Sequence, residues 1–476
     1  MKTKANCNIL GEVMQKENIL GTAPVGKLLR KFAVPSIVSM LVISLYNIVD
    51  QFFIGQTVGA LGNAATNMAF PITTLCLAVT LAFGIGGASG FNLNMGAGDR
   101  NKAMKFVGNS VTMLFAVGVV IAIIVQLILN PVLVFFQTPE KVLPYAVEYL
   151  RVILLGVPFV MLAGGGAHLI RADGSPWYSM ACNASGAVAN VILDYLFVMK
   201  FGWGMTGAAV ATVLGQVLSC GIAVIYLFNF KADKILLKHL KPQFSIVLRT
   251  MQLGAAQFLN QLAMVLVQVA ANYSAIYYGK LSKYGPEIPL ACSGIIIKVL
   301  MIYFSFCIGI SQGMQPIASF NKGAKKYDRV KKVFLIALAC NEVISIIAWI
   351  IMQTFPSQIM GLFAESSAKD FHLYIECGTK FCRIVSALAF INGIQPLSST
   401  FCTAIGKPAK GTFISLTRQI IFWLPLLIVM PIVFRYFGGE GIDGMMYSTP
   451  VADALAAIVS ILMIRSVFKK DLKTEA

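Results

Sequence analysis

Twelve long apolar spans, separated by short polar turns, constrain the fold of this 476-residue chain more than any other feature. A bilayer-spanning helix needs roughly 20 mostly apolar residues. Hydrophobic residues make up 57% of the chain and charged residues only 12%, which excludes a disordered chain and disfavours a soluble enzyme. We therefore predict an all-α polytopic membrane protein. Its spans run approximately over residues 27–55, 62–91, 104–130, 144–170, 176–200, 206–230, 245–279, 289–319, 330–354, 375–404, 411–434 and 442–468.

The basic residues predict how these spans are oriented. Of the 38 Lys and Arg residues, 27 fall on one side of the predicted membrane and 7 on the other. Cytoplasmic loops carry such an excess, so we expect a cell (inner) membrane protein with both termini in the cytoplasm. The net charge of +18 then reflects topology, and we expect no nucleic-acid partner. The expected domains are a cytoplasmic segment 1–26, an N-lobe 27–230, a cytoplasmic linker 231–244, a C-lobe 245–468 and a cytoplasmic tail 469–476.

The two halves of the chain repeat the same turn motifs in the same order. An Asn-x-Gly-Ala motif recurs at 94–97 and 321–324, a Gly-x-Pro motif at 174–176 and 406–408, and Phe-Gly at 201–202 and 437–438. The offsets between the halves are 227, 232 and 236 residues. Because each half holds six spans, we predict two six-helix lobes related by an axis along the membrane normal, with a binding site between them.

Carboxylates within the spans are the strongest indication of function, because a charge in hydrocarbon is costly. Asp50, Asp194 and Thr212 each lie five to seven residues from the outer ends of their spans, roughly 8–10 Å deep at ~1.5 Å per residue. Asn190 precedes Asp194 by one helical turn and faces the same way. Such a set suits a proton or a hard cation such as Na⁺, which prefers oxygen ligands. The structural alternatives are helix capping, amide pairing and, for Thr212, a bond to its own backbone.

Further polar residues recur on one face of several spans. Such stripes line either a cavity or a helix–helix seam. Lys298 is a buried cation that either has a structural partner or contacts the substrate, and Glu342 and Asp453 have no assigned role. The glycine-rich stretch 84–90 is expected to be a close-packing surface or a flexible point. The candidate cavity residues are Tyr46, Asn47, Asn183, Gln216, Gln257, Gln261, Gln268, Asn272 and Lys298.

From about residue 19 to residue 468, the chain resembles the multidrug and toxic compound extrusion (MATE) family. The residues that carry the resemblance are 20–29, Pro35, 47–55, 94–99 and 189–194. The resemblance implies that Asp50, Asn190, Asp194 and Thr212 match the positions proposed for the coupling ion in relatives. It is closest to the drug-exporter branch that keeps its acids in the N-lobe. Another branch has acids in spans 7 and 10, where we expect none.

These observations together predict a secondary antiporter that is not an enzyme and needs no cofactor. It would export amphipathic, often cationic drugs through the lipid bilayer by alternating access, in exchange for H⁺ or Na⁺, and we expect a monomer. No metal site is expected apart from possible Na⁺ binding at the coupling residues. The alternatives are a flippase for lipid-linked precursors, which shares the two-lobed plan, and an uncoupled channel or membrane enzyme.

Overall fold

Long helices make up most of the computed structural model, which describes residues 18–135, 138–362 and 371–472. Eleven of these helices are long and apolar enough to cross a membrane. A pair bent by 42°, Phe371–Ile391 and Ile394–Ala404, forms a twelfth span. The predicted twelve-helix all-α architecture is therefore confirmed. Most of the predicted N-terminal segment and half of the predicted C-terminal tail lie outside the described residues.

The first half of the chain forms one lobe, whose centre is the helix α7. Small residues let neighbouring helices approach α7 closely, because a Cβ placed on Gly165 would lie 2.3 Å from the Leu114 side chain. The elements of this half are α2 (Ile19–Thr22), α3 (Val25–Thr57), α4 (Ala60–Gly96), α5 (Arg100–Leu127), α6 (Leu129–Phe135), α7 (Leu143–Ala172), α8 (Pro176–Asp194), the π-helical segment η1 (Tyr195–Lys200) and α9 (Gly204–Phe228).

The second half forms the other lobe, and a short helix, α10 (Leu237–Leu240), lies in the linker between the two. The predicted span 375–404 begins earlier than expected and bends between Ile391 and Ile394, whereas the predicted span 411–434 contains a π-helical segment. The elements of this half are α11 (Phe244–Lys280), α12 (Glu287–Gly323), α13 (Tyr327–Thr354), α14 (Pro356–Gly361), α15 (Phe371–Val385), η2 (Ala389–Ile391), α16 (Ile394–Ala404), α17 (Pro408–Leu416), η3 (Thr417–Trp423), α18 (Leu424–Tyr436) and α19 (Gly441–Lys470).

The backbone repeats itself at the turns where the sequence does. A positive φ angle, which glycine adopts most readily, occurs at matched positions in both halves. The separations within these pairs are the same 227, 232 and 236 residues that separate the sequence motifs. The internal repeat is thus visible in the chain path. The matched pairs are Gly98 with Lys325, Gly174 with Gly406, and Gly202 with Gly438.

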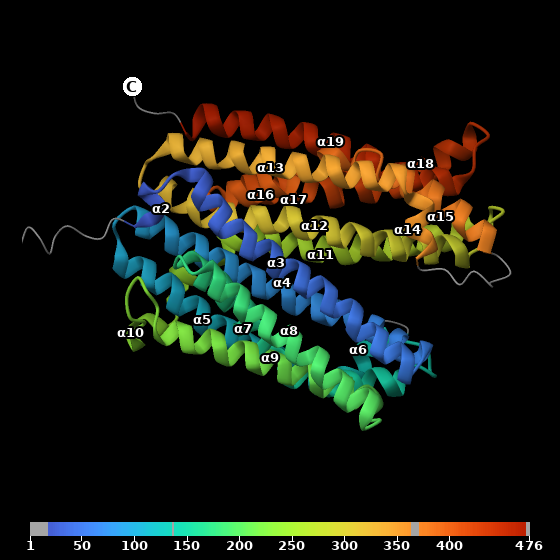
Figure 1. Cartoon of the computed structure of the whole chain (residues 1–476), viewed down its shortest axis with the longest axis horizontal. Coiled ribbons are helices and arrows are strands. Elements are labelled where there is room, and N and C mark those ends of the chain that lie inside the picture. The colour runs from blue at the N-terminus through green and yellow to red at the C-terminus, as the bar shows by residue number, and fades with distance from the viewer. Residues whose placement is uncertain (1–17, 136–137, 363–370, 473–476) are drawn as a thin grey trace, which may run out of the picture.

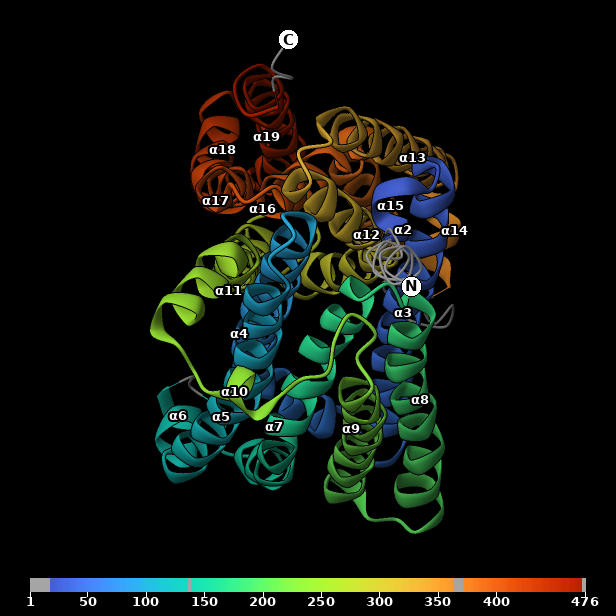
Figure 2. The same ribbon diagram turned by 90° about the vertical axis from the view of Figure 1, so that its left-hand side faces the viewer.

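Both lobes run the full length of the molecule and diverge toward one end (Figure 1). The helix α2 and the last turn of α19 lie at the opposite end, which we call the termini end (Figure 2). We call the other end the far end. The chain therefore starts and finishes its described path on the same side, as an even number of spans requires.

Glycines bring the two lobes into close contact in the half of the molecule nearest the termini end. A Cβ on Gly86 of α4 would lie 2.1 Å from the Thr250 carbonyl oxygen of α11, and a Cβ on Gly254 would lie 2.0 Å from the Ala82 carbonyl oxygen. A Cβ on Gly96 would lie 2.0 Å from the Phe320 carbonyl oxygen of α12. These contacts confirm that the stretch 84–90 is a close-packing surface.

Polar contacts extend this closed seam toward the middle of the molecule. The Gln315 amide of α12 donates to the Ser89 hydroxyl at 2.8 Å and to the Ile85 carbonyl at 3.1 Å. Among the described residues, the inter-lobe hydrogen bond nearest the far end joins the hydroxyls of Ser44 and Ser305 at 2.8 Å. The structure therefore has its lobes closed at the termini end.

Candidate functional site

The four predicted coupling residues meet inside the N-lobe. Asp50 comes from α3, Asn190 and Asp194 come from the last turns of α8, and Thr212 comes from α9. The Asn190 amide donates to the Thr212 hydroxyl at 3.3 Å, and the two carboxyl groups are close neighbours. Asp194 has 0% and Asn190 3% of its surface exposed. The α-helix gives way to the π-helical segment η1 immediately after Asp194, a change of pitch that is frequent at functional sites.

Oxygen atoms dominate this site, and donors for them are missing. Asp50 Oδ1, both carboxylate oxygens of Asp194 and Asn190 Oδ1 are buried without a hydrogen-bond partner among the described residues. Buried polar atoms are normally paired, and two carboxylates can share a hydrogen bond only if a proton lies between them. The arrangement therefore favours a bound proton or a small cation with oxygen ligands.

Tyr149 of α7 also belongs to this site, although the sequence analysis did not select it. Its side chain is a neighbour of Thr212 and of both carboxyl groups, and 8% of the residue is exposed. Tyr149 is six residues from the start of α7 at the far end, so it shares the depth of the two acids. Counting residues from the outer end of each span, as was done for the acids, would have found Tyr149 if tyrosine hydroxyls had been included.

The N-lobe candidates for the substrate cavity have different surroundings. Tyr46 is close to both acids, whereas Asn47 is exposed and donates to the Ile43 carbonyl at 2.7 Å. The Asn183 amide donates to the Ser39 hydroxyl at 2.7 Å, so it joins α8 to α3. Gln216 Oε1 is buried without a partner among the described residues. Tyr46 is therefore a neighbour of the acid pair, whereas Asn47 and Asn183 bond elsewhere.

The C-lobe candidates are divided between seam and open positions. The Gln257 amide donates to the Thr400 hydroxyl at 3.3 Å, which ties α11 to α16 inside the lobe. Gln268 donates to Asn272 at 2.9 Å along the same helix. Gln261 and Lys298 are half-buried, and Lys298 has no ion pair among the described residues.

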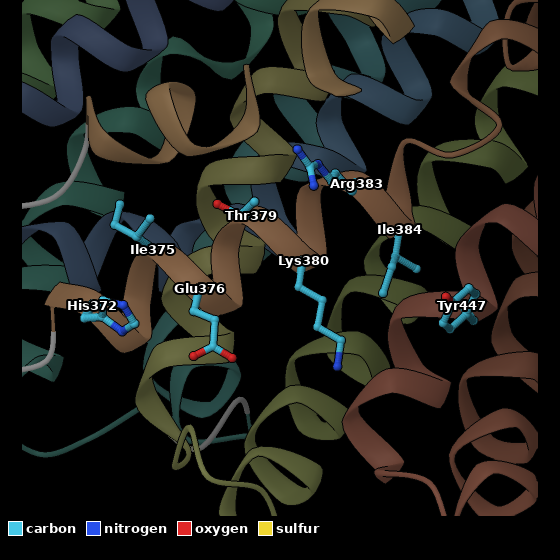
Figure 3. Close-up of a pocket in the computed structure, with 8 residues that line it drawn as sticks. All are labelled: His372, Ile375, Glu376, Thr379, Lys380, Arg383, Ile384 and Tyr447. Atoms are coloured by element: carbon cyan, nitrogen blue, oxygen red, sulfur yellow. The ribbon is translucent and has the colours of Figure 1, made fainter. Parts of the chain in front are cut away.

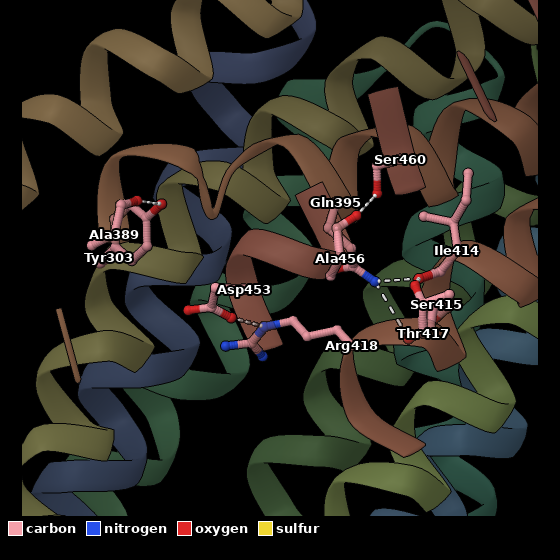
Figure 4. A network of polar contacts seen from close by, with 10 residues as sticks. All are labelled: Tyr303, Ala389, Gln395, Ile414, Ser415, Thr417, Arg418, Asp453, Ala456 and Ser460. Atoms are coloured by element: carbon pink, nitrogen blue, oxygen red, sulfur yellow. Dashed lines mark hydrogen bonds and ion pairs between the residues drawn. The ribbon is translucent and has the colours of Figure 1, made fainter. Parts of the chain in front are cut away.

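The acids that had no assigned role lie elsewhere in the C-lobe. Figure 4 shows the Asp453 carboxylate of α19 meeting the Arg418 guanidinium of η3, at a distance of 2.6 Å. The same guanidinium lies 5.7 Å from the Phe304 ring centroid and 5.4 Å from that of Trp423. Asp453 thus has a structural partner, whereas Glu342 Oε1 is buried without one among the described residues.

One expectation about the C-lobe is wrong. Span 10 does contain an acid, since α15 (Phe371–Val385) carries Glu376, which already falls within the predicted span 375–404. Glu376 Oε1 accepts hydrogen bonds from Lys283 at 2.5 Å and from the Tyr284 hydroxyl at 3.0 Å. It is therefore paired, unlike the two acids of the N-lobe.

Two lobes of six spans, with a pair of neighbouring acids inside one lobe, define a membrane transporter of the two-lobed class. The family model described as MatE matches residues 35–196 and 258–429, and the chain belongs to this family. As a member, it is a transporter and not an enzyme.

Relatives of known function cover nearly the whole chain. "Multidrug export protein MepA" of Staphylococcus aureus (strain N315) is 24% identical over 444 residues, which are 93% of this chain and 94% of the relative. The protein of the same name from Staphylococcus saprophyticus is 24% identical over 436 residues, 91% of this chain and 92% of its own.

Solved structures share the fold. A "MOP superfamily transporter from Pyrococcus furiosus", whose title describes a "reverse polarity of binding pocket", has a TM-score of 0.88 at 21% identity, covering 97% of this chain and 99% of its own. A structure titled "Outward-facing conformation of a multidrug resistance MATE family transporter" has a TM-score of 0.86 at 22% identity, covering 96% and 98%.

Proposed function

We propose that this protein exports amphipathic, often cationic drugs across the cell membrane in exchange for H⁺ or Na⁺. The observation that carries the proposal is the set of buried oxygen atoms around Asp50 and Asp194 that lack hydrogen-bond donors among the described residues. The relatives named multidrug export proteins support export of drugs as the direction and cargo of transport.

Neutralisation of the acid pair is the proposed coupling step. A proton or Na⁺ bound between Asp50 and Asp194 cancels charge that would otherwise be buried when the lobe rearranges. The Thr212 hydroxyl, which donates to the Ala208 carbonyl and accepts from Asn190, and the Tyr149 hydroxyl add further oxygen atoms near the pair. Because drug and coupling cation compete for the same lobe, entry of one favours release of the other, and this competition gives exchange.

The two-lobed packing supplies the proposed alternating access. The seam at the termini end is built from glycine contacts and a few hydrogen bonds, which a rocking motion of rigid lobes can separate. We propose that the termini end faces the cytoplasm, on the strength of the excess of basic residues there. In that orientation the structure is closed to the cytoplasm.

The experiment is efflux of a fluorescent cationic dye from proteoliposomes that contain the purified full-length protein. A pH gradient and a Na⁺ gradient are imposed separately, and an ionophore that collapses each gradient serves as the control. The proposal predicts saturable efflux that one of the two gradients accelerates and its ionophore abolishes. Dye flux that is unsaturable and independent of both gradients would instead indicate an uncoupled channel.

A further inference from the structure

A second polar site lies in the C-lobe near the far end, away from the acid pair. Figure 3 shows Glu376, Thr379, Lys380 and Arg383 along α15, beside a cavity of about 560 Å³. A volume of this size suits a drug-sized ligand. The cavity does not include any of the predicted coupling or cavity residues, so it is distinct from the site of the proposed ion coupling.

Charged side chains around this cavity are paired, with one exception. Lys283 bonds Glu376 and Lys380 bonds Asp443, each at 2.5 Å, so these four charges cancel. The Arg383 guanidinium has no hydrogen bond or ion pair among the described residues and is exposed to the cavity. The described wall therefore carries one uncompensated positive charge.

The unpaired charge of Arg383 lies well inside a membrane-spanning helix. It lies twelve residues into α15, about 18 Å along the helix at ~1.5 Å per residue. An arginine at such depth is too costly to face acyl chains, so it faces protein or water. The opposite face of α15 packs in the lobe through Cys377, Gly378 and Phe381, which are buried. The polar stripe therefore faces an aqueous space.

The rest of the wall offers a second donor and apolar surfaces. The Thr379 hydroxyl, one turn before Arg383, is buried and has no partner among the described residues. Ile375, Ile384 and the Tyr447 ring also line the cavity. The Tyr447 ring is held in place by stacking on Phe434, with centroids 5.4 Å apart. A guanidinium beside a hydroxyl matches a carboxylate, and the apolar wall matches an aromatic or aliphatic body.

We propose that this cavity is a binding site for amphipathic organic anions that carry one negative charge. The anionic group binds the Arg383 guanidinium and the Thr379 hydroxyl, and the apolar body packs against Tyr447. The proposed cation site and this anion site thus lie in different lobes.

Equilibrium binding of 2-naphthoate to the full-length protein in phosphatidylcholine nanodiscs tests this proposal by isothermal titration calorimetry. The neutral 2-naphthamide, which has the same ring system, is the matched ligand. We expect naphthoate to bind about tenfold more tightly than naphthamide, as a hydrogen bond to a charged group implies. Equal affinities would overturn the proposal. No ion gradient is present, so this failure would leave the cation-coupling proposal untouched.

Variants assign the binding to the cavity. Arg383→Gln should weaken naphthoate binding about tenfold and leave naphthamide unchanged. Arg435→Gln, a change of the same kind at the far end of α18 outside the cavity, should affect neither ligand. Glu376→Gln should tighten naphthoate binding, because it removes a negative charge and frees Lys283. A misfolded variant cannot bind more tightly, so an unchanged or weakened affinity for Glu376→Gln would contradict the proposal.

An anionic lipid headgroup could also bind Arg383. A change in the lipid composition of the nanodisc distinguishes such a lipid from a soluble organic anion. If the affinity for naphthoate is lower in nanodiscs with phosphatidylglycerol than in phosphatidylcholine nanodiscs, an anionic lipid competes for Arg383. Equal affinity in both bilayers assigns the site to a soluble anion. Either result supports an anion site, whereas loss of the dependence on Arg383 in both bilayers would refute it.

Discussion

In the N-lobe, the carboxyl groups of Asp50 and Asp194 have buried oxygen atoms without hydrogen-bond donors among the described residues. Asp50 and Asp194 were predicted together because the ends of their spans place them at one depth. Tyr149 was missed because its ring reads as an ordinary apolar residue in a membrane helix. Glu376 was overlooked although it is the second residue of the predicted span 375–404. The free guanidinium of Arg383 could not be foreseen, since its partners depend on packing between helices.

Asp173 links the loop after α7 to the linker 231–244, outside the membrane spans. Burial raises its pKa to about 6, although the N–H groups of Lys231 and Ala232 and the Tyr226 hydroxyl donate to it and oppose that rise. If the linker detaches, the pKa of Asp173 returns toward 3.8. Attachment should therefore be strongest below about pH 4, weaken as the pH rises to about 6, and stay constant above that.

Hydrogen exchange of residues 231–243, corrected for its intrinsic pH dependence, measures this attachment. Opening should become easier between pH 4 and pH 6 in the wild type, whereas Asp173→Asn, which cannot ionise, should show no such step. Superimposable pH profiles for the two proteins would contradict the assignment.

At the scale of elements, the sequence predicts the number and order of the spans but not their irregularities. The π-helical segments η1 and η3 and the bend between α15 and α16 lie within continuous apolar runs, where hydropathy is the same for any helical pitch. Turns were easier to predict, because Gly-x-Pro and Asn-x-Gly-Ala motifs mark chain reversals. One repeated turn is imperfect, since Lys325 has a φ of 57° where its counterpart is Gly98.

Lys325→Gly should stabilise the protein by up to about 1 kcal/mol, because a side chain in the left-handed region is strained. Lys332→Gly, in an exposed position of the adjacent helix α13, should destabilise it by about 1 kcal/mol. The midpoint of thermal unfolding in detergent measures both changes. A lower midpoint for Lys325→Gly would show that the turn is not strained.

The whole molecule depends on how closely its lobes approach at the termini end. The sequence predicts two lobes and a packing surface at 84–90, but it cannot say which lobe that surface meets. In the structure Gly86 meets Thr250 and Gly254 of the other lobe, whereas Gly84, Gly87 and Gly90 pack inside the N-lobe. Gly86 is therefore the glycine of this stretch that serves the closed state.

Gly86→Val should prevent this closure, because its Cβ would lie 2.1 Å from the Thr250 carbonyl oxygen. Gly221→Val is the matched control, since a Cβ there has no neighbour within 4 Å. Spin labels at Lys102 and Lys331, one on each lobe, should show a longer distance in Gly86→Val only, and drug efflux should be lost. Closure at the wild-type distance would refute the role of the seam.

The central claim is that Asp50 and Asp194 couple transport to a cation gradient, and Asp194→Asn tests it most directly. The amide keeps the size of the side chain but cannot change its charge, so it imitates the cation-loaded state permanently. Gradient-driven efflux and gradient-free drug exchange are measured in the same proteoliposomes at matched protein levels. We expect Asp194→Asn, and Asp50→Asn nearly as strongly, to lose gradient-driven efflux while drug exchange persists. Asp453→Asn and Glu342→Gln should keep their gradient dependence. Full gradient-driven efflux in both Asp194→Asn and Asp50→Asn would contradict the account and direct attention to Glu342 or Asp453.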